Sequence, residues 1–168
     1  MLPGTLGPQD FSVPTRTLRG RIAVAAMERL TDLLAEGEAT VETALECGLD
    51  GEGRRTIAGR VQARLPMRCH RCLQVYDHVV DSSFHVVVVE SGAEAEALPD
   101  ELEPFISEGG AVSPHAVVEE ELLLSLPVVA LHDDRNACLP PAHAAGMTPE
   151  RTSPFAALQG RLGGREED

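Results

Sequence analysis

The stretch TVETALECGL, Thr40–Leu49, decides the fold class because its side chains alternate between two kinds. The even positions hold threonine, glutamate, alanine and glycine, whereas the odd positions hold four apolar residues and one threonine. This period of two predicts a strand with one buried face. Cys47 lies on the apolar side, so we expect it to be a core thiol. The sequence DGEG at residues 50–53 is a hairpin turn signal and predicts that the next strand returns antiparallel.

The period of two continues after this turn. Arg60, Gln62 and Arg64 take even positions, and apolar residues take most of the odd ones. Two further apolar segments, at residues 75–80 and 84–89, predict additional strands. Since short turns separate these segments, an antiparallel order along the chain is the simplest arrangement.

Two other segments show helical spacing. Residues 20–36 carry apolar side chains at intervals of four, which predicts a helix. Residues 114–126 form the second predicted helix, which Ser113 caps and Pro127 ends. Residues 91–111 are rich in glycine, alanine, proline and acidic residues, so we expect a long surface loop. The sequence therefore predicts an α+β fold, with an antiparallel β-meander or a partly closed barrel-like sheet packed with two main helices.

The chain length of 168 residues and the hydrophobic fraction of 43% fit one globular domain. We expect this single α+β domain at residues 1–139. Residues 140–168 change composition toward proline, alanine, glycine and arginine, and are expected to be a linker and C-terminal tail. Apolar residues recur at helical spacing within residues 153–162, which predicts a short segment that docks on its own domain or on a partner.

Composition and motifs exclude several classes of protein. The apolar runs are far shorter than the roughly 20 residues of a membrane helix. The N-terminus lacks the pattern of a secretory signal, so we expect a cytoplasmic protein with no membrane partner. No nucleotide-binding, hydrolase or metalloprotease motif is present, which indicates that the protein is not an enzyme. The net charge of −13 excludes a protein that coats nucleic acid indiscriminately.

The positive charges are concentrated in one part of the chain. All 14 basic residues are arginine, and residues 53–76 contain six of them with no acidic residue. This segment therefore carries +6, whereas the remainder carries −19. Because guanidinium groups bind phosphate oxygens in pairs, we predict RNA contacts at Arg60, Arg64, Arg68 and Arg71. The alternative is a solvated sheet face whose arginines pair with acidic side chains elsewhere. Aromatic residues are scarce here, so base stacking on single strands is weakly supported.

Four residues have the ligand chemistry of zinc. Cys69 and Cys72 form a C-x-x-C, and His132 and Cys138 follow downstream. Without an export signal the thiols are expected to be reduced, which argues against disulfides. The set predicts a structural Cys₃His zinc site. The alternative is a turn whose thiols pack as small hydrophobic side chains.

Several of these motifs occur in an order that resembles a known family. They are LPMRCHRCL at residues 65–73, VVEEELLLSLPVV at 117–129, the following His132 and Cys138, and SPFAAL at 153–158. This order, together with the strand at residues 41–47, resembles the YceD-like family of large ribosomal RNA subunit accumulation proteins. The resemblance extends over roughly residues 11–162.

The resemblance carries implications for the site and the function. The family pattern marks Cys69, Arg71, Cys72, Leu126, Pro127, His132 and Cys138. The chain departs from the pattern at Ser153, where the family has asparagine, at Ala130, where it often has proline, and in an acidic rather than lysine-rich end. The resemblance implies a ribosome-biogenesis factor whose partner is 23S ribosomal RNA or its precursor. The charge of −19 outside residues 53–76 leaves an alternative, an acidic adaptor or chaperone for a basic large-subunit ribosomal protein.

Overall fold

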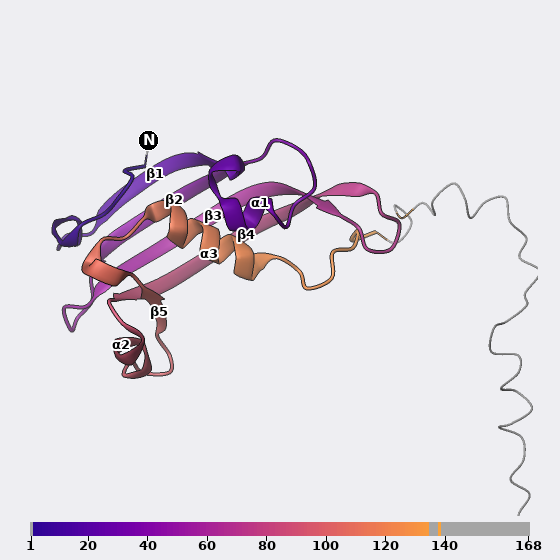
Figure 1. Ribbon diagram of the computed structural model, residues 1–168. Coiled ribbons are helices and arrows are strands. Elements are labelled where there is room, and N and C mark those ends of the chain that lie inside the picture. The colour runs from indigo at the N-terminus through magenta and orange to yellow at the C-terminus, as the bar shows by residue number, and fades with distance from the viewer. Residues whose placement is uncertain (1, 135–137, 139–168) are drawn as a thin grey trace, which may run out of the picture.

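The structure is a computed structural model that describes residues 2–134 and residue 138 (Figure 1). Its strands are β1 (Arg16–Ala23), β2 (Thr40–Leu49), β3 (Arg55–Arg68), β4 (Val75–Val89) and β5 (Glu103–Ile106). Its helices are α1 (Glu28–Thr31), α2 (Gly92–Glu96) and α3 (Pro114–Ser125), with 3-10 turns at Pro8–Asp10, Val24–Ala26 and Glu108–Gly110. No helix in this part of the chain is long and apolar enough to cross a membrane. The elements form the α+β fold that the sequence predicts.

The strands form one open sheet in chain order, β1-β2-β3-β4-β5. Strands β1 to β4 pair antiparallel, and β5 runs parallel to β4 at one edge. The register pairs Glu42 with Gln62 and Gln62 with Asp81, so these three residues share one face of the sheet. The predicted meander is confirmed for β1 to β4. The barrel-like alternative is wrong, because the sheet is not closed.

The core lies between α3 and one face of this sheet (Figure 1). Val118 and Leu122 of α3 are fully buried, as are Leu45, Val61 and Leu65 of the sheet. Each such side chain contributes about 1.5–3 kcal/mol relative to an exposed one. Cys47 lies among them as a buried thiol, as predicted. We call the opposite face of the sheet the open face; it carries Arg19, Arg21, Glu42, Ala44, Arg60, Gln62, Arg64, Arg68, Val79 and Asp81.

Polar contacts fix α3 in place above the core. Glu119 accepts a hydrogen bond from the backbone N–H of Leu30 at 3.1 Å and pairs with Arg29. Glu121 accepts a hydrogen bond from the Ser82 hydroxyl at 2.5 Å. These contacts join α3 to α1 and β4. They determine where the chain emerges at the C-terminal end of the helix.

The helix predicted at residues 20–36 is wrong over most of its length. Its first part belongs to β1, and α1 is the only α-helical turn that remains. Ile22 pairs with Val41 and is buried on the core side of the sheet. Gly20 would weaken a helix interior by about 1 kcal/mol, whereas pairing with β2 satisfies the backbone of β1. Consequently α3 alone serves as a main helix, where the sequence predicts two.

Two other expectations are corrected by the structure. The surface loop predicted at residues 91–111 contains α2, β5 and a 3-10 turn, and its Ser91 caps α2 by accepting a hydrogen bond from the Glu94 N–H. The two apolar segments predicted as separate strands form the single strand β4. The polar residues between the two segments fit into the strand because their side chains find partners. Asp81 forms an ion pair with Arg60, and the Ser82 hydroxyl donates a hydrogen bond to Glu121 of α3.

The predictions for the end of the chain are not tested by the fold. The linker and tail at residues 140–168, with the docking segment at 153–162, lie outside the described residues. The domain boundary placed at residue 139 therefore stays a prediction.

Candidate metal centre and arginine face

The loop between β3 and β4 contains the C-x-x-C motif. The Cys69 N–H donates to the carbonyl of Gln74 at 2.9 Å, and the Leu73 N–H donates to the carbonyl of Cys69 at 2.9 Å. Leu73 has a φ of 63°, in the left-handed region, which lets the chain reverse within this short loop. Cys69 and Cys72 are both buried. Residues 70–72 form the short turn expected between the two neighbouring strands.

The chain after α3 returns to this loop. The helix ends at Ser125; Leu126 after it has an extended backbone, as expected for a residue that precedes a proline. Ala130 is buried, and its carbonyl accepts a hydrogen bond from the His70 N–H at 2.9 Å. These contacts bring the segment with His132 against the β3–β4 loop. Leu126 and Pro127 thus mark the point where the chain leaves α3 and turns toward the cysteines.

The four predicted ligands meet in one cluster. The Cys69 and Cys138 sulfurs lie 3.6 Å apart. The His132 Nδ1 atom lies 3.6 Å from the Cys72 sulfur and 3.2 Å from the Cys138 sulfur. All four ligand atoms lie within 4.8 Å of one another. The arrangement brings together residues from two distant parts of the chain, and it offers three sulfurs and one imidazole nitrogen to a single ion.

The surroundings of the cluster favour a thiolate. Burial raises the pKa of the Cys69 thiol, but hydrogen bonds from the backbone N–H groups of Cys72, Arg71 and His132 lower it to about 5. The Arg71 guanidinium donates toward the Cys138 sulfur at 3.6 Å. Burial, with the sulfurs of Cys69 and Cys72 next, raises the pKa of the Cys138 thiol. At neutral pH one negative sulfur is therefore stabilised at this site, and the thiolate is the form that binds metals.

An aromatic side chain supports the histidine. The Tyr76 ring lies 4.8 Å from the His132 ring, centroid to centroid, with an interplanar angle of 37°. Tyr76 comes from the start of β4, next to the loop. This contact fixes the orientation of the imidazole relative to the sulfurs. Nothing in the spacing of the sequence indicates it, because it depends on the return of the chain after α3.

The predicted RNA-contacting arginines occupy two places. Arg60, Arg64 and Arg68 are exposed and follow one another along the open face on β3. Arg60 donates two hydrogen bonds of 2.7 Å to Asp81, and Arg68 donates to the carbonyl of Leu73 at 3.0 Å. Arg71 lies apart from them, in the loop beside the metal-ligand cluster.

Arg60 forms an ion pair with Asp81. Its hydrogen bonds and charge hold the pKa of the Asp81 carboxyl below its usual range, with Gln62 donating to the same carboxylate at 3.0 Å. Asp81 in turn raises the pKa of the Arg60 guanidinium. The alternative to RNA contact from the sequence analysis is that these arginines pair with acidic side chains. Arg60 does form such a pair, with Asp81.

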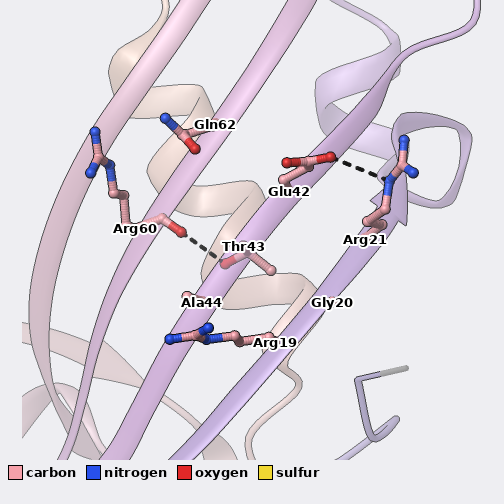
Figure 2. A pocket seen from close by; sticks show the side chains of 8 residues that line it. All are labelled: Arg19, Gly20, Arg21, Glu42, Thr43, Ala44, Arg60 and Gln62. Carbon is pink, nitrogen blue, oxygen red and sulfur yellow. Dashed lines mark hydrogen bonds and ion pairs between the residues drawn. The ribbon is translucent and has the colours of Figure 1, made fainter.

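The open face also holds two arginines that the sequence reasoning missed. Arg19 and Arg21 of β1 line a hollow of about 560 Å³ together with Arg60 (Figure 2). Arg21 pairs with Glu42 at 3.6 Å. Their signal in the sequence is the alternation of Leu18, Gly20 and Ile22 with arginine, which is hidden by the helical spacing of the residues that follow.

Comparison with known proteins agrees with these motifs. The family described as "Large ribosomal RNA subunit accumulation protein YceD" matches residues 57–160. A protein of that description from Haemophilus influenzae is 26% identical over 163 residues, and the match covers 94% of each chain. No solved structure matches the chain. The matched residues contain the C-x-x-C loop, α3 and both downstream ligands, and they make up more than half of the sequence, so the chain belongs to the YceD family.

Proposed function

We propose that this protein is a non-enzymatic ribosome-biogenesis factor that supports the synthesis, processing or accumulation of 23S ribosomal RNA in the cytoplasm. The described role of its relative, accumulation of large-subunit ribosomal RNA, supports this proposal. The protein acts through direct contact with the RNA or its precursor. Arg60, Arg64, Arg68 and Arg71 are the residues that bind phosphate.

The observation that carries the proposal is the exposure of three arginines along one strand, on the sheet face that α3 does not cover. Arg60, Arg64 and Arg68 all point to the face opposite α3. A guanidinium group presents paired donors that match two phosphate oxygens. Arg71 adds a fourth positive charge beside the loop where β3 ends. The acidic remainder of the chain repels RNA elsewhere and limits binding to this face.

We propose further that Cys69, Cys72, His132 and Cys138 hold a structural zinc ion. Zn–S bonds of about 2.3 Å and Zn–N bonds of about 2.0–2.1 Å in a tetrahedron place ligand atoms about 3.6–3.8 Å apart. The two separations of 3.6 Å match these values, and the 3.2 Å between His132 Nδ1 and the Cys138 sulfur is shorter than a bound zinc ion would set. The ion would tie the chain after α3 to the β3–β4 loop. It would thereby hold Arg68 and Arg71 in a fixed position at the end of the open face.

A second candidate function is an adaptor for a basic large-subunit ribosomal protein. The observation that favours it is the composition of residues 72–134, which contain 14 acidic residues and neither lysine nor arginine. Such a one-signed surface attracts basic partners over a long range.

Co-purification with and without nuclease separates the two functions. The tagged full-length protein is captured from its native cytoplasm at low salt, and bound RNA and proteins are identified. Our proposal predicts recovery of 23S ribosomal RNA or its precursor, and release of ribosomal proteins after nuclease treatment. Retention of one basic ribosomal protein after complete RNA digestion, with no RNA recovered beforehand, would establish the adaptor instead.

A further inference from the structure

The register of the sheet places a second arginine-bearing strand beside β3. Arg19 of β1 pairs with Ala44 of β2, and Ala44 pairs with Arg60 of β3. Directly paired residues share a face of the sheet, so Arg19 stands in the same cross-strand row as Arg60. Arg19 lies outside the arginine-rich residues 53–76, and its position beside them follows from the fold alone.

We infer that the RNA-contacting surface extends across the sheet to Arg19, that it takes the sugar-phosphate backbone of double-helical RNA, and that Asp81 competes with phosphate for Arg60. This inference rests on the proposed function and specifies the class of RNA that the same face recognises.

Arg19 is available for a ligand. It is exposed, and its side chain has neither a hydrogen bond nor an ion pair within residues 2–134 and 138; the same holds for the side chain of Arg64. The small side chain of Ala44 on β2 leaves a hollow of about 560 Å³ between the arginines of β1 and Arg60 of β3. Figure 2 shows the Arg19 side chain extending beside Ala44 from β1. A phosphate that enters this hollow meets Arg19 on one side and Arg60 on the other.

The spacing of the arginines suits several phosphates rather than one. Neighbouring strands lie about 4.8 Å apart, so Arg19 and Arg60, two strands apart, are about 10 Å from each other. Residues advance about 3.3 Å along a strand, so Arg60, Arg64 and Arg68 follow at intervals of about 13 Å. One phosphate in the hollow can meet Arg19 and Arg60, but it cannot also reach Arg64 and Arg68, which lie about 13 Å and about 26 Å from Arg60 along the strand. A surface that spreads its charges over two strands in this way matches the separated phosphates of a helical backbone.

Among the residues of β1 to β4, the open face offers only one ring for stacked bases, the imidazole of His85 opposite Ala58. Among the residues of β1 to β4 that alternate onto this face, none is phenylalanine, tyrosine or tryptophan. Tyr76 and Phe84 have the opposite parity on β4 and point to the other side. Proteins that bind single strands stack bases on aromatic rings, whereas double-helical RNA is recognised through phosphates, 2′-hydroxyls and shape. The open face therefore fits the duplex.

Asp81 sets the strength of the contact at Arg60. Its carboxylate accepts hydrogen bonds from Nε and Nη2 of Arg60, at 2.7 Å each, and a third from Gln62. A phosphate can use this edge of Arg60 only after the carboxylate is displaced, whereas the edge formed by Nη1 and Nη2 stays open. Asp81 also repels phosphate by its own charge. Its removal should therefore strengthen RNA binding.

Equilibrium binding of the full-length protein to defined RNAs tests the inference. The probes are an RNA hairpin with a stem of about 16 base pairs, the length that double-strand binding domains span, and an oligouridine of equal nucleotide length. The variants are Arg19→Gln and Asp81→Asn. Arg29→Gln is the matched control, because Arg29 lies on the other side of the sheet and pairs with α3. Thermal unfolding of each variant verifies that it is folded.

We expect the hairpin to bind more tightly than oligouridine. Arg19→Gln should weaken hairpin binding about fivefold to tenfold at about 0.1 M salt and reduce the salt slope by about 1. Asp81→Asn should tighten binding, and Arg29→Gln should leave it unchanged. If the protein binds RNA but Arg19→Gln and Asp81→Asn have no effect, or if oligouridine binds as well as the hairpin, the inference is wrong while the proposed function stands. If neither those probes nor the ribosomal RNA precursor binds, the proposed function itself fails.

Discussion

Removal of one ligand of the proposed zinc site, by Cys138→Ser, should loosen one end of the molecule and leave the sheet core folded. Without the metal, the two segments are joined by a hydrogen bond of 2.9 Å from the His70 N–H to the Ala130 carbonyl and by the contact between the Tyr76 and His132 rings. Such a bond contributes about 0.5–1.5 kcal/mol. The core between α3 and the sheet contains none of the four ligands. Amide hydrogen exchange should therefore increase in residues 68–76 and 126–134 and stay slow in β2 and β3.

The magnitude follows from linkage between metal binding and folding. With free zinc about a thousandfold above its dissociation constant, a site that exists only in the folded chain adds about 4 kcal/mol of stability. For a domain of this size, that stabilisation corresponds to a rise of about 8–16 °C in Tm. The assays are zinc content by mass spectrometry of the native protein and thermal unfolding with zinc or with a chelator.

Cys47, the cysteine outside the cluster, provides the control. Burial raises the pKa of the Cys47 thiol to about 11, and Cys47 lies in the core outside the cluster of four ligands. Cys47→Ala should lower Tm through poorer packing and keep one zinc per chain, whereas Cys138→Ser should release the zinc. A native protein without zinc, with a Tm that neither zinc nor chelator changes, would refute the reasoning.

Three further predictions concern the sheet and the helix above it. Arg60→Gln should raise the pKa of Asp81 toward its usual value, and NMR titration of the carboxyl carbon measures this change. Because Arg60 lowers the pKa of Asp81 in the folded protein, the small stabilisation by this exposed pair is present above the unfolded-state pKa and is lost as the pH falls through the folded-state pKa. An unchanged titration curve would contradict the pairing. Leu122→Ala should cost about 2–5 kcal/mol in urea unfolding, since this side chain is fully buried under α3; a destabilisation below about 1 kcal/mol would show that α3 does not cover the core. Gly59→Ala should destabilise by about 1–3 kcal/mol, because the added methyl group would lie 2.5 Å from the Phe84 ring and 2.8 Å from Leu45, and a neutral effect would contradict this packing.

The parts of the fold that local patterns determine were predictable. In β2 and β3 one face is buried along most of the strand, so the alternation of residues 40–49 and 57–65 reports the structure directly. The helix α3 carries its own start and stop signals in Ser113 and Pro127. In each case, neighbouring residues in the chain contain the information.

The errors arise where a distant partner decides the structure. Residues 16–23 form a strand because β2 is available for pairing, and a window of local sequence cannot contain that partner. The short β5 has too few residues for a recognisable period, and only its parallel pairing with β4 defines it.

The candidate site divides in the same way. Cysteine and histidine chemistry indicated the four ligands, but their approach to within 4.8 Å depends on the position of α3 and on the return of the chain at Ala130. The arginines of β3 were visible as a local excess of charge. Arg19 and the competing Asp81 were not, because cross-strand register places them beside Arg60.

The central claim is that arginines of the open face and the adjoining loop bind ribosomal RNA directly. Filter binding of a large-subunit ribosomal RNA precursor over a range of salt concentrations tests it most directly, with the wild-type chain, the folded variant R60Q/R64Q/R68Q/R71Q and the variant R60Q/R64Q/R68Q, which leaves the loop intact. The account predicts that the affinity falls and that the salt slope drops by about 1 for each phosphate that a variant no longer binds. Folded variants that bind with unchanged affinity and unchanged salt slope would contradict it.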